Sequence, residues 1–293
     1  MTSSRPTRPS PRRSNRISAS MADTRTLAIT HVTTYRYDTP VFYALQQLRL
    51  IPRSGHGQRV IEWGSTIRGG TKQLAFTDQF VNHSELVRVD SGATQIEIVS
   101  QGVVEIEDRQ GVIGRQTSGY APLWLFEVPT PRTAAGNSIR HLAAQVRAET
   151  EDADEIDRLH HLSAAIARAV AYETGRTDSD TTAEMALAAG HGVCQDHAHI
   201  MIAAARQLGH PARYISGYLL MDGRVTQDAS HAWCEVWTAH LGWIGFDVSN
   251  GICPDARYVR VATGRDYADA APIMGIRQGA GGEDLHVTLQ VQQ

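Results

Sequence analysis

Alternating apolar and polar positions run through the chain from residue 24 to about residue 118. The apolar residues stand two positions apart and are separated by turn-forming residues. They include Leu27 and Ile29, Tyr35 and Tyr37, Leu48 and Leu50, Val87 and Val89, and Ile96 and Ile98. A period of two is typical of strands that bury one face. Residues 24–118 are therefore predicted to form an N-terminal β-sandwich-like domain that supports a core or narrows access to its site.

The periodicity becomes helical after a proline-containing connector at residues 122–131. Apolar residues then recur at spacings of three and four, which is the pattern of one helix face. This predicts helices over residues 139–146, 156–170 and 194–208. Strand-like runs follow at 212–220, 230–237, 243–248 and 285–291. Helices followed by antiparallel strands predict an α+β core over residues 119–293, with the last run as its C-terminal strand.

Cys194 begins the third of these helices. Gly190 and Gly192 precede it and allow the backbone to approach a substrate closely, while Gly209 favours a helix end. Unpaired N–H groups and the helix dipole at a helix N-terminus favour an anion, and so favour the reactive thiolate of a cysteine placed there. The same N–H groups can stabilise the oxyanion of a tetrahedral intermediate. Cys194 is therefore a candidate nucleophile.

His231 and Asp247 fall on one face of a predicted hairpin whose loop lies at residues 238–242. If the hairpin is centred on Ala239, His231 lies directly across from Asp247, close enough for the carboxylate to hold one imidazole nitrogen. The other nitrogen is then free to face a thiol. A cysteine, a histidine and an acid in this order predict a catalytic triad of nucleophile, base and orienter.

Each triad candidate has an ordinary explanation when it is taken alone. A cysteine on an apolar helix face is usually a small buried hydrophobic residue, and a strand histidine is usually structural. The helix start and the shared hairpin favour a joint catalytic role instead. Cys234 points to the opposite face of its strand, beside Val236, and is expected to pack in the core. Cys253 has no partner that the sequence identifies.

At these residues the chain resembles the transglutaminase-like superfamily of papain-type cysteine enzymes, in particular its bacterial group with an N-terminal β domain. The core segments that carry the resemblance are 192–196, 209–214, 217–218, 230–233, 242–247, 250–251 and 261–267. Softer N-terminal matches are His31, Tyr35, Tyr37, residues 40–41, 49–50 and 52–53, Asp78 and Asn82. The resemblance covers nearly everything from about residue 26 onward. It implies a papain-like core with the nucleophile helix packed on an antiparallel sheet, and it assigns the same three roles to Cys194, His231 and Asp247.

The chain departs from the family pattern at two places near the candidate site. His197 stands where the family usually has an aromatic residue, and Val248-Ser249 stands where it usually has Pro-Thr. Neither departure removes a triad member. The first is expected to alter the pocket beside the thiol.

The expected activity is cysteine-dependent acyl transfer that cleaves a peptide or isopeptide amide through a thioester. We favour a thiol protease or amidase over a transamidating transglutaminase, because a cross-linking enzyme must exclude water and nothing in the sequence indicates that. A zinc hydrolase and a non-catalytic binding module stay open as alternatives. Zinc would draw on His191, Cys194, His197 and His199, but a second metal-binding element is lacking, and a metal would occupy the nucleophile. No metal and no cofactor are expected.

Composition adds limits on partners and compartment. The chain has 293 residues, of which 42% are hydrophobic and 20% charged, and no apolar run approaches the ~20 residues that span a bilayer. Residues 1–20 hold five arginines and no acid, and the other residues carry 23 basic against 31 acidic side chains, a net −8. We expect a disordered basic tail over residues 1–23, no nucleic-acid or membrane partner, and a peptide or protein substrate. Three cysteines without a disulfide framework favour the cytoplasm.

Overall fold

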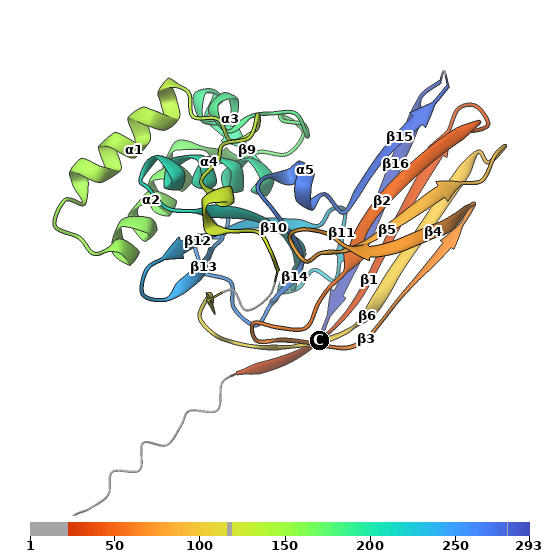
Figure 1. Cartoon of the computed structure of the whole chain (residues 1–293), viewed down its shortest axis with the longest axis horizontal. Helices are drawn as coiled ribbons and strands as arrows, with labels where there is room; N and C mark the ends of the chain where they lie inside the picture. The colour runs from red at the N-terminus through yellow and green to blue at the C-terminus, as the bar shows by residue number, and fades with distance from the viewer. Residues whose placement is uncertain (1–22, 116–118, 280) are drawn as a thin grey trace, which may run out of the picture.

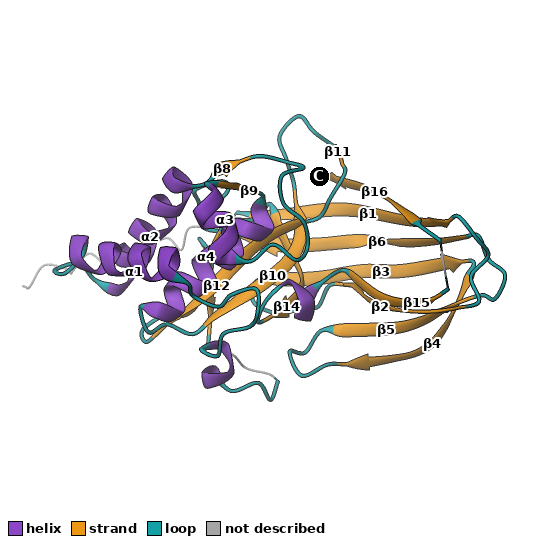
Figure 2. Ribbon diagram, turned by 90° about the horizontal axis from the view of Figure 1, so that it is seen from above, coloured by secondary structure: helices purple, strands orange, loops and turns teal. Residues whose placement is uncertain are grey.

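A computed structural model describes residues 23–115, 119–279 and 281–293. The expected basic tail lies outside the described residues except for Asp23. Helices gather at one end of the molecule and long strands extend from the other (Figures 1 and 2). No helix of the described ranges is both long and apolar enough to cross a membrane.

Long antiparallel strands, most of them from the N-terminal part of the chain, form two sheets that face each other. One sheet has the order β11-β16-β1-β6-β3 and the other β15-β2-β5-β4. Their strands are β1 (Thr24–Tyr37), β2 (Tyr43–Ile51), β3 (Gln58–Arg68), β4 (Gly70–Thr77), β5 (His83–Val89), β6 (Gln95–Glu107), β11 (Thr226–Gln227), β15 (Ile273–Gln278) and β16 (Glu283–Gln292). Apolar residues from the inner faces pack together, among them Leu48, Val87, Ile96 and Ile98. The predicted alternation therefore produces a sandwich-like arrangement.

The C-terminal strands complete these two sheets. β16 pairs with β1 from Ala28↔Gln292 to Tyr37↔Glu283, and β15 pairs with β2. The sequence pattern predicts that the final strand belongs to the unit over residues 119–293, whereas in the structure it belongs to the first sheet. The reason is that Leu289 and Val291 are buried in one cluster with Leu27 and Ile29. The predicted boundaries between the tail, the N-terminal domain and the core, after residues 23 and 118, stay a prediction.

The remaining elements form the expected α+β core. Its sheet has the order β14-β10-β12-β13-β7. The strands are β7 (Val112–Gly114), β10 (Ala212–Leu219), β12 (His231–Thr238), β13 (Gly242–Phe246) and β14 (Tyr258–Gly264). The helices are η1 (Leu123–Phe126), α1 (Asn137–Glu149), α2 (Glu155–Ala169), α3 (Ala183–Ala189), α4 (Cys194–Gln207) and α5 (Tyr267–Ala270), and a short parallel pair joins β8 (Ala171–Tyr172) to β9 (His191–Gly192).

Helix α4 is the centre of this core. Its residues Ile200 to Ala205 are at most 1% exposed, and they pack with side chains from α1, α2, α3, β10 and β12. Three successive alanines, Ala203 to Ala205, keep that part of the helix thin where its neighbours approach. The predicted α+β arrangement, with the helix that begins at Cys194 packed on an antiparallel sheet, is confirmed.

Candidate active site

The start of helix α4 is held by the acid one turn into it. Asp196 Oδ2 accepts hydrogen bonds from the backbone N–H of Val193 at 2.8 Å and from Thr177 Oγ1 at 2.7 Å. Gly190, with φ of 72°, ends helix α3 in the left-handed region that favours glycine. The chain then turns through β9 directly into Cys194. The prediction that Cys194 begins a helix is therefore confirmed.

Tyr172 is a neighbour of Cys194 that the sequence analysis did not identify. The parallel pairing of β8 with β9 places Tyr172 beside Gly192, where its hydroxyl interacts with Cys194. Burial raises the pKa of Tyr172, and the charges of Cys194 and Asp247 raise it further, so the hydroxyl stays a neutral donor. Tyr172 is 54% exposed, so solvent reaches it.

His231 is the first residue of β12 and lies between Cys194 and Asp247. Its Nε2 donates to Asp247 Oδ2 at 2.6 Å, which leaves Nδ1 for the Cys194 thiol. The imidazole lies 5.9 Å from the Tyr258 ring and 6.2 Å from the Trp233 ring, measured between centroids. Burial alone lowers the pKa of His231, but the hydrogen bonds with Asp247 and Cys194 outweigh it and raise the pKa to about 10. The structure thus favours an imidazolium beside the thiol.

Asp247 is buried and accepts hydrogen bonds from three side chains at one oxygen. Besides His231, the donors to Oδ2 are Asn250 Nδ2 at 2.6 Å and Tyr258 Oη at 2.7 Å. Burial alone raises the pKa of Asp247, but the bond from His231 and these two donors lower it overall. Asp247 is therefore a carboxylate whose position is fixed from three directions. Tyr258 was not anticipated, because a tyrosine within a strand is usually part of the core.

The hairpin that brings His231 and Asp247 together has a different register from the one predicted. The pairs Cys234↔Phe246 and Trp237↔Trp243 centre it on His240, so direct opposition of His231 and Asp247 was wrong. Continuing this register places Trp233 across from Asp247. The shift is two positions along one strand, so His231 stays on the same face as a diagonal neighbour. The two side chains still meet.

The two departures from the family pattern contact each other. His197 Nδ1 accepts a hydrogen bond from Ser249 Oγ at 2.8 Å, and His197 Nε2 donates to the Val170 carbonyl at 3.1 Å. Burial lowers the pKa of His197, which keeps its ring neutral. The pair therefore links helix α4 to the loop after Asp247, close to Cys194.

The four side chains considered for zinc do not form a ligand set. His197 is engaged by Ser249 and Val170, and His199 accepts a bond from the Tyr267 N–H at 3.1 Å. Within the part of the chain that the structure describes, no group of three His, Cys, Asp or Glu residues is placed to hold a metal. The donor positions therefore do not favour the zinc hydrolase alternative.

The three cysteines differ in burial and surroundings. Cys234 is fully buried in the main core, as predicted, and its burial raises the pKa of the thiol well above the usual value. Burial also raises the pKa of the half-buried Cys253. Cys194 is half-buried too, but it lies next to an imidazolium and a helix N-terminus.

Limiting iodoacetamide should consequently label Cys194 first. The His231 imidazolium, whose pKa is raised to about 10, persists at neutral pH and favours the reactive thiolate. In His231→Ala this support is lost, so the labelling rate should fall at neutral pH. Peptide mapping after brief exposure measures this. Equal labelling of all three cysteines would contradict it.

Comparison with known proteins finds two family models along the chain. The model described as transglutaminase-like superfamily matches residues 140–248, and the one described as bacterial transglutaminase-like N-terminal region matches residues 27–105. An uncharacterized protein of Mycobacterium leprae is 29% identical over 278 residues, which cover 90% of this chain and 98% of that protein. An uncharacterized protein of Mycobacterium tuberculosis is 30% identical over 285 residues, covering 89% and 90%. A solved structure named "Putative Cysteine Protease" from Cytophaga hutchinsonii shares the fold, with a TM-score of 0.72, 20% identity, and 93% and 92% coverage.

Proposed function

This chain belongs to the transglutaminase-like superfamily, with an N-terminal region of the bacterial type, and we propose that it is a cysteine-dependent acyl-transfer enzyme. In this proposal Cys194 is the nucleophile, His231 the acid and base, and Asp247 the orienter. The main support for it is the 2.6 Å hydrogen bond from His231 to the buried Asp247 carboxylate, together with the interaction of the same imidazole with Cys194. A nucleophile on a helix start, a base and a buried carboxylate meet there from three separate segments.

The first half of the reaction forms a thioester. The Cys194 thiolate attacks the carbonyl carbon of an amide, and the carbonyl oxygen becomes an oxyanion. In this proposal the backbone N–H groups at the start of α4 and the Tyr172 hydroxyl stabilise it. The His231 imidazolium then gives its proton to the departing amine as the C–N bond breaks. The acyl group remains on Cys194 and His231 is neutral.

The second half transfers the acyl group. Neutral His231 removes a proton from an acceptor, and the acceptor attacks the thioester and releases the Cys194 thiolate. If the acceptor is water the product is a carboxylic acid, and if it is a primary amine the product is a new amide. Asp247, held by Asn250 and Tyr258, keeps Nε2–H of His231 in place throughout, so that Nδ1 exchanges the proton.

Hydrolysis of a peptide or isopeptide bond is the outcome that we favour. Cys194 is only half-buried and Tyr172 beside it is 54% exposed, so water reaches the site. A dedicated cross-linking enzyme has to keep water from its thioester. The activity that we favour is therefore that of a thiol protease or amidase, and the alternative is a transamidating transglutaminase.

A library of peptides and isopeptides, scored for released amine with and without added primary amine, tests this choice. We expect acid products to dominate even with millimolar amine present, and Cys194→Ala to give neither product. Product formed only when the amine is added would establish transamidation instead. Release that persists in Cys194→Ala would contradict the cysteine mechanism.

A further inference from the structure

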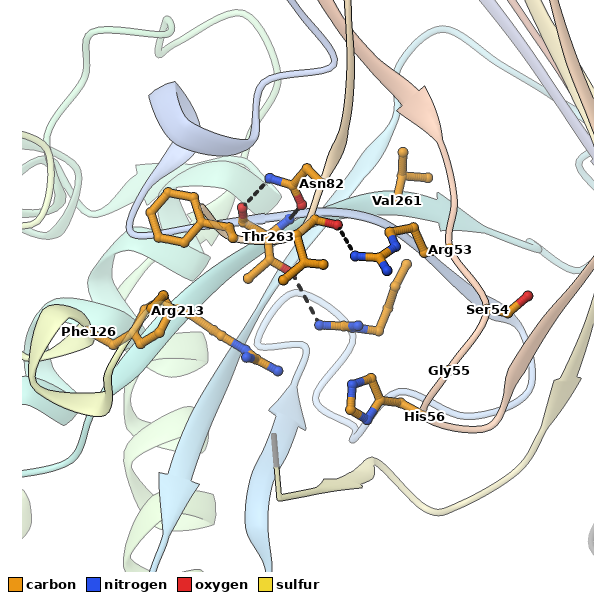
Figure 3. A pocket seen from close by; sticks show the side chains of 13 residues that line it. Arg53, Ser54, Gly55, His56, Asn82, Phe126, Arg213, Val261 and Thr263 are labelled. Carbon is orange, nitrogen blue, oxygen red and sulfur yellow. Dashed lines mark hydrogen bonds between the residues drawn. The ribbon is translucent and has the colours of Figure 1, made fainter. Parts of the chain in front are cut away.

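A polar cavity lies where the N-terminal sheets meet the core sheet, apart from the triad. Its volume is about 90 Å³, against roughly 10–15 Å³ needed to hold one water. The loop after β2 contributes Arg53, Ser54 and His56 to its lining, and β10 and β14 contribute Arg213 and Arg260. Figure 3 shows Arg53, His56 and Arg213 pointing into the same space.

The charges around this cavity do not balance. Arg213 Nη2 lies 2.6 Å from Glu235 Oε2, and Arg260 Nε donates to Glu235 Oε1 at 2.6 Å, so two guanidinium groups share one carboxylate. Arg53 donates to the Val81 carbonyl, which is neutral. Among the described residues that line the cavity none is acidic. Three positive charges therefore face one negative charge.

Neighbouring charges do not remove this excess. Asp78, which is bonded to the lining residue Asn82, is paired with Arg49 at 3.4 Å. Burial lowers the pKa of His56, and the charge of Arg260 lowers it further, so His56 is a neutral ring, and its Nδ1–H is donated to the Ile113 carbonyl at 3.2 Å. The excess of two positive charges thus stays with the three arginines.

Two cations that share a single buried carboxylate are costly to bury. Glu235 is fully buried and the Arg213 side chain is 6% exposed, so water stabilises this group poorly. Burial lowers the pKa of Arg213 to about 10 even though Glu235 acts in the opposite direction. A counter-ion in the cavity would relieve this cost, since guanidinium groups bind phosphate and carboxylate oxygens in paired hydrogen bonds.

We propose that this cavity binds a small doubly charged oxyanion of the phosphate or sulfate class. A dianion balances the excess of two charges, whereas a single carboxylate balances half of it. The cavity is small enough to exclude a large ligand, and its mouth at Arg53 is exposed. Because the lining comes from both halves of the chain, the bound anion joins the loop at residues 53–56 to β10 and β14.

Thermal unfolding and calorimetric titration of the full chain with inorganic phosphate test the proposal. At constant ionic strength, saturating phosphate should raise Tm by about 3 °C or more over chloride. Sulfate should do the same, and acetate should do less. A parallel titration with phosphoserine distinguishes a phosphorylated molecule from the free ion as the natural ligand. Tighter binding of phosphoserine indicates a phosphorylated molecule, and tighter binding of phosphate indicates the free ion.

Two arginine variants of equal charge change provide the matched comparison. Arg53→Gln should raise the phosphate Kd about tenfold. Arg59→Gln removes a surface arginine that is paired with Glu105 outside the cavity, and it should leave Kd unchanged. Both positions are exposed, so both variants should fold. A phosphate effect no larger than that of chloride, or equal weakening in the two variants, would overturn the proposal.

Discussion

Replacing Cys194 with alanine should abolish turnover, with a loss of roughly ten-thousandfold or more, while the protein stays folded. The loss is large because no other thiol is in reach of His231. Cys234 lies in the core, on the opposite face of the strand that starts at His231. Stability should change little, because Cys194 is half-buried and alanine is the best helix former. Turnover on a substrate from the library and the thermal midpoint measure the two effects.

Cys253→Ala is the matched control for this variant. Cys253 is also half-buried, but it lies beside Gly111 and has no contact with the triad among the described interactions. Its replacement should leave turnover within about twofold. If Cys253→Ala removed activity and Cys194→Ala did not, the assignment of the nucleophile would be wrong.

Replacing Asp247 with asparagine should lower turnover by about a thousandfold to ten-thousandfold. The Oδ2 of Asp247 accepts hydrogen bonds from His231, Asn250 and Tyr258, and an amide cannot accept all three if its NH₂ group faces them. An asparagine that turns its NH₂ group toward His231 donates to Nε2, and so it holds the imidazole in the wrong tautomer. Loss of the carboxylate also removes the main support for the raised pKa of His231, so the imidazolium should be lost at lower pH.

Asp266→Asn is the control with a comparable buried carboxylate. Asp266 begins helix α5, where its side chain accepts from the Ala268 N–H, and asparagine serves equally well at that position. Turnover in this variant should be near wild type. If Asp247→Asn also kept its turnover and its pH profile, another group would have to orient His231.

The sequence was sufficient for features that depend on local periodicity. Cys194 at a helix start and Cys234 on the core face of its strand follow from spacings of 3.6 and 2 within a dozen residues. The hairpin register was missed because it depends on the turn. The residues Ala239 to Leu241 form the connection, and Gly242, with φ of 78°, re-enters the strand and centres the hairpin on His240.

Features that depend on distant segments were not predictable from local patterns. Tyr172 reaches Cys194 through a two-residue parallel pairing, and Tyr258 reaches Asp247 from β14, which β10 and β12 separate from β13 in the sheet. The final strand, β16, pairs with β1, although most of the chain separates the two in sequence. The alternation in β16 predicts which face is buried but not which strand is its neighbour. In each case the contact is set by packing of the whole fold.

Trapping the acyl group on the protein shows whether Cys194 is the nucleophile. p-Nitrophenyl acetate is a simple acyl donor, and the protein is quenched in acid during turnover and analysed by mass spectrometry. We expect a burst of p-nitrophenol and an acetyl thioester on the peptide that contains Cys194. Both should be absent in Cys194→Ala, and both should form much more slowly in His231→Ala. Turnover without an acyl group on Cys194, or with the acyl group on another residue, would contradict it.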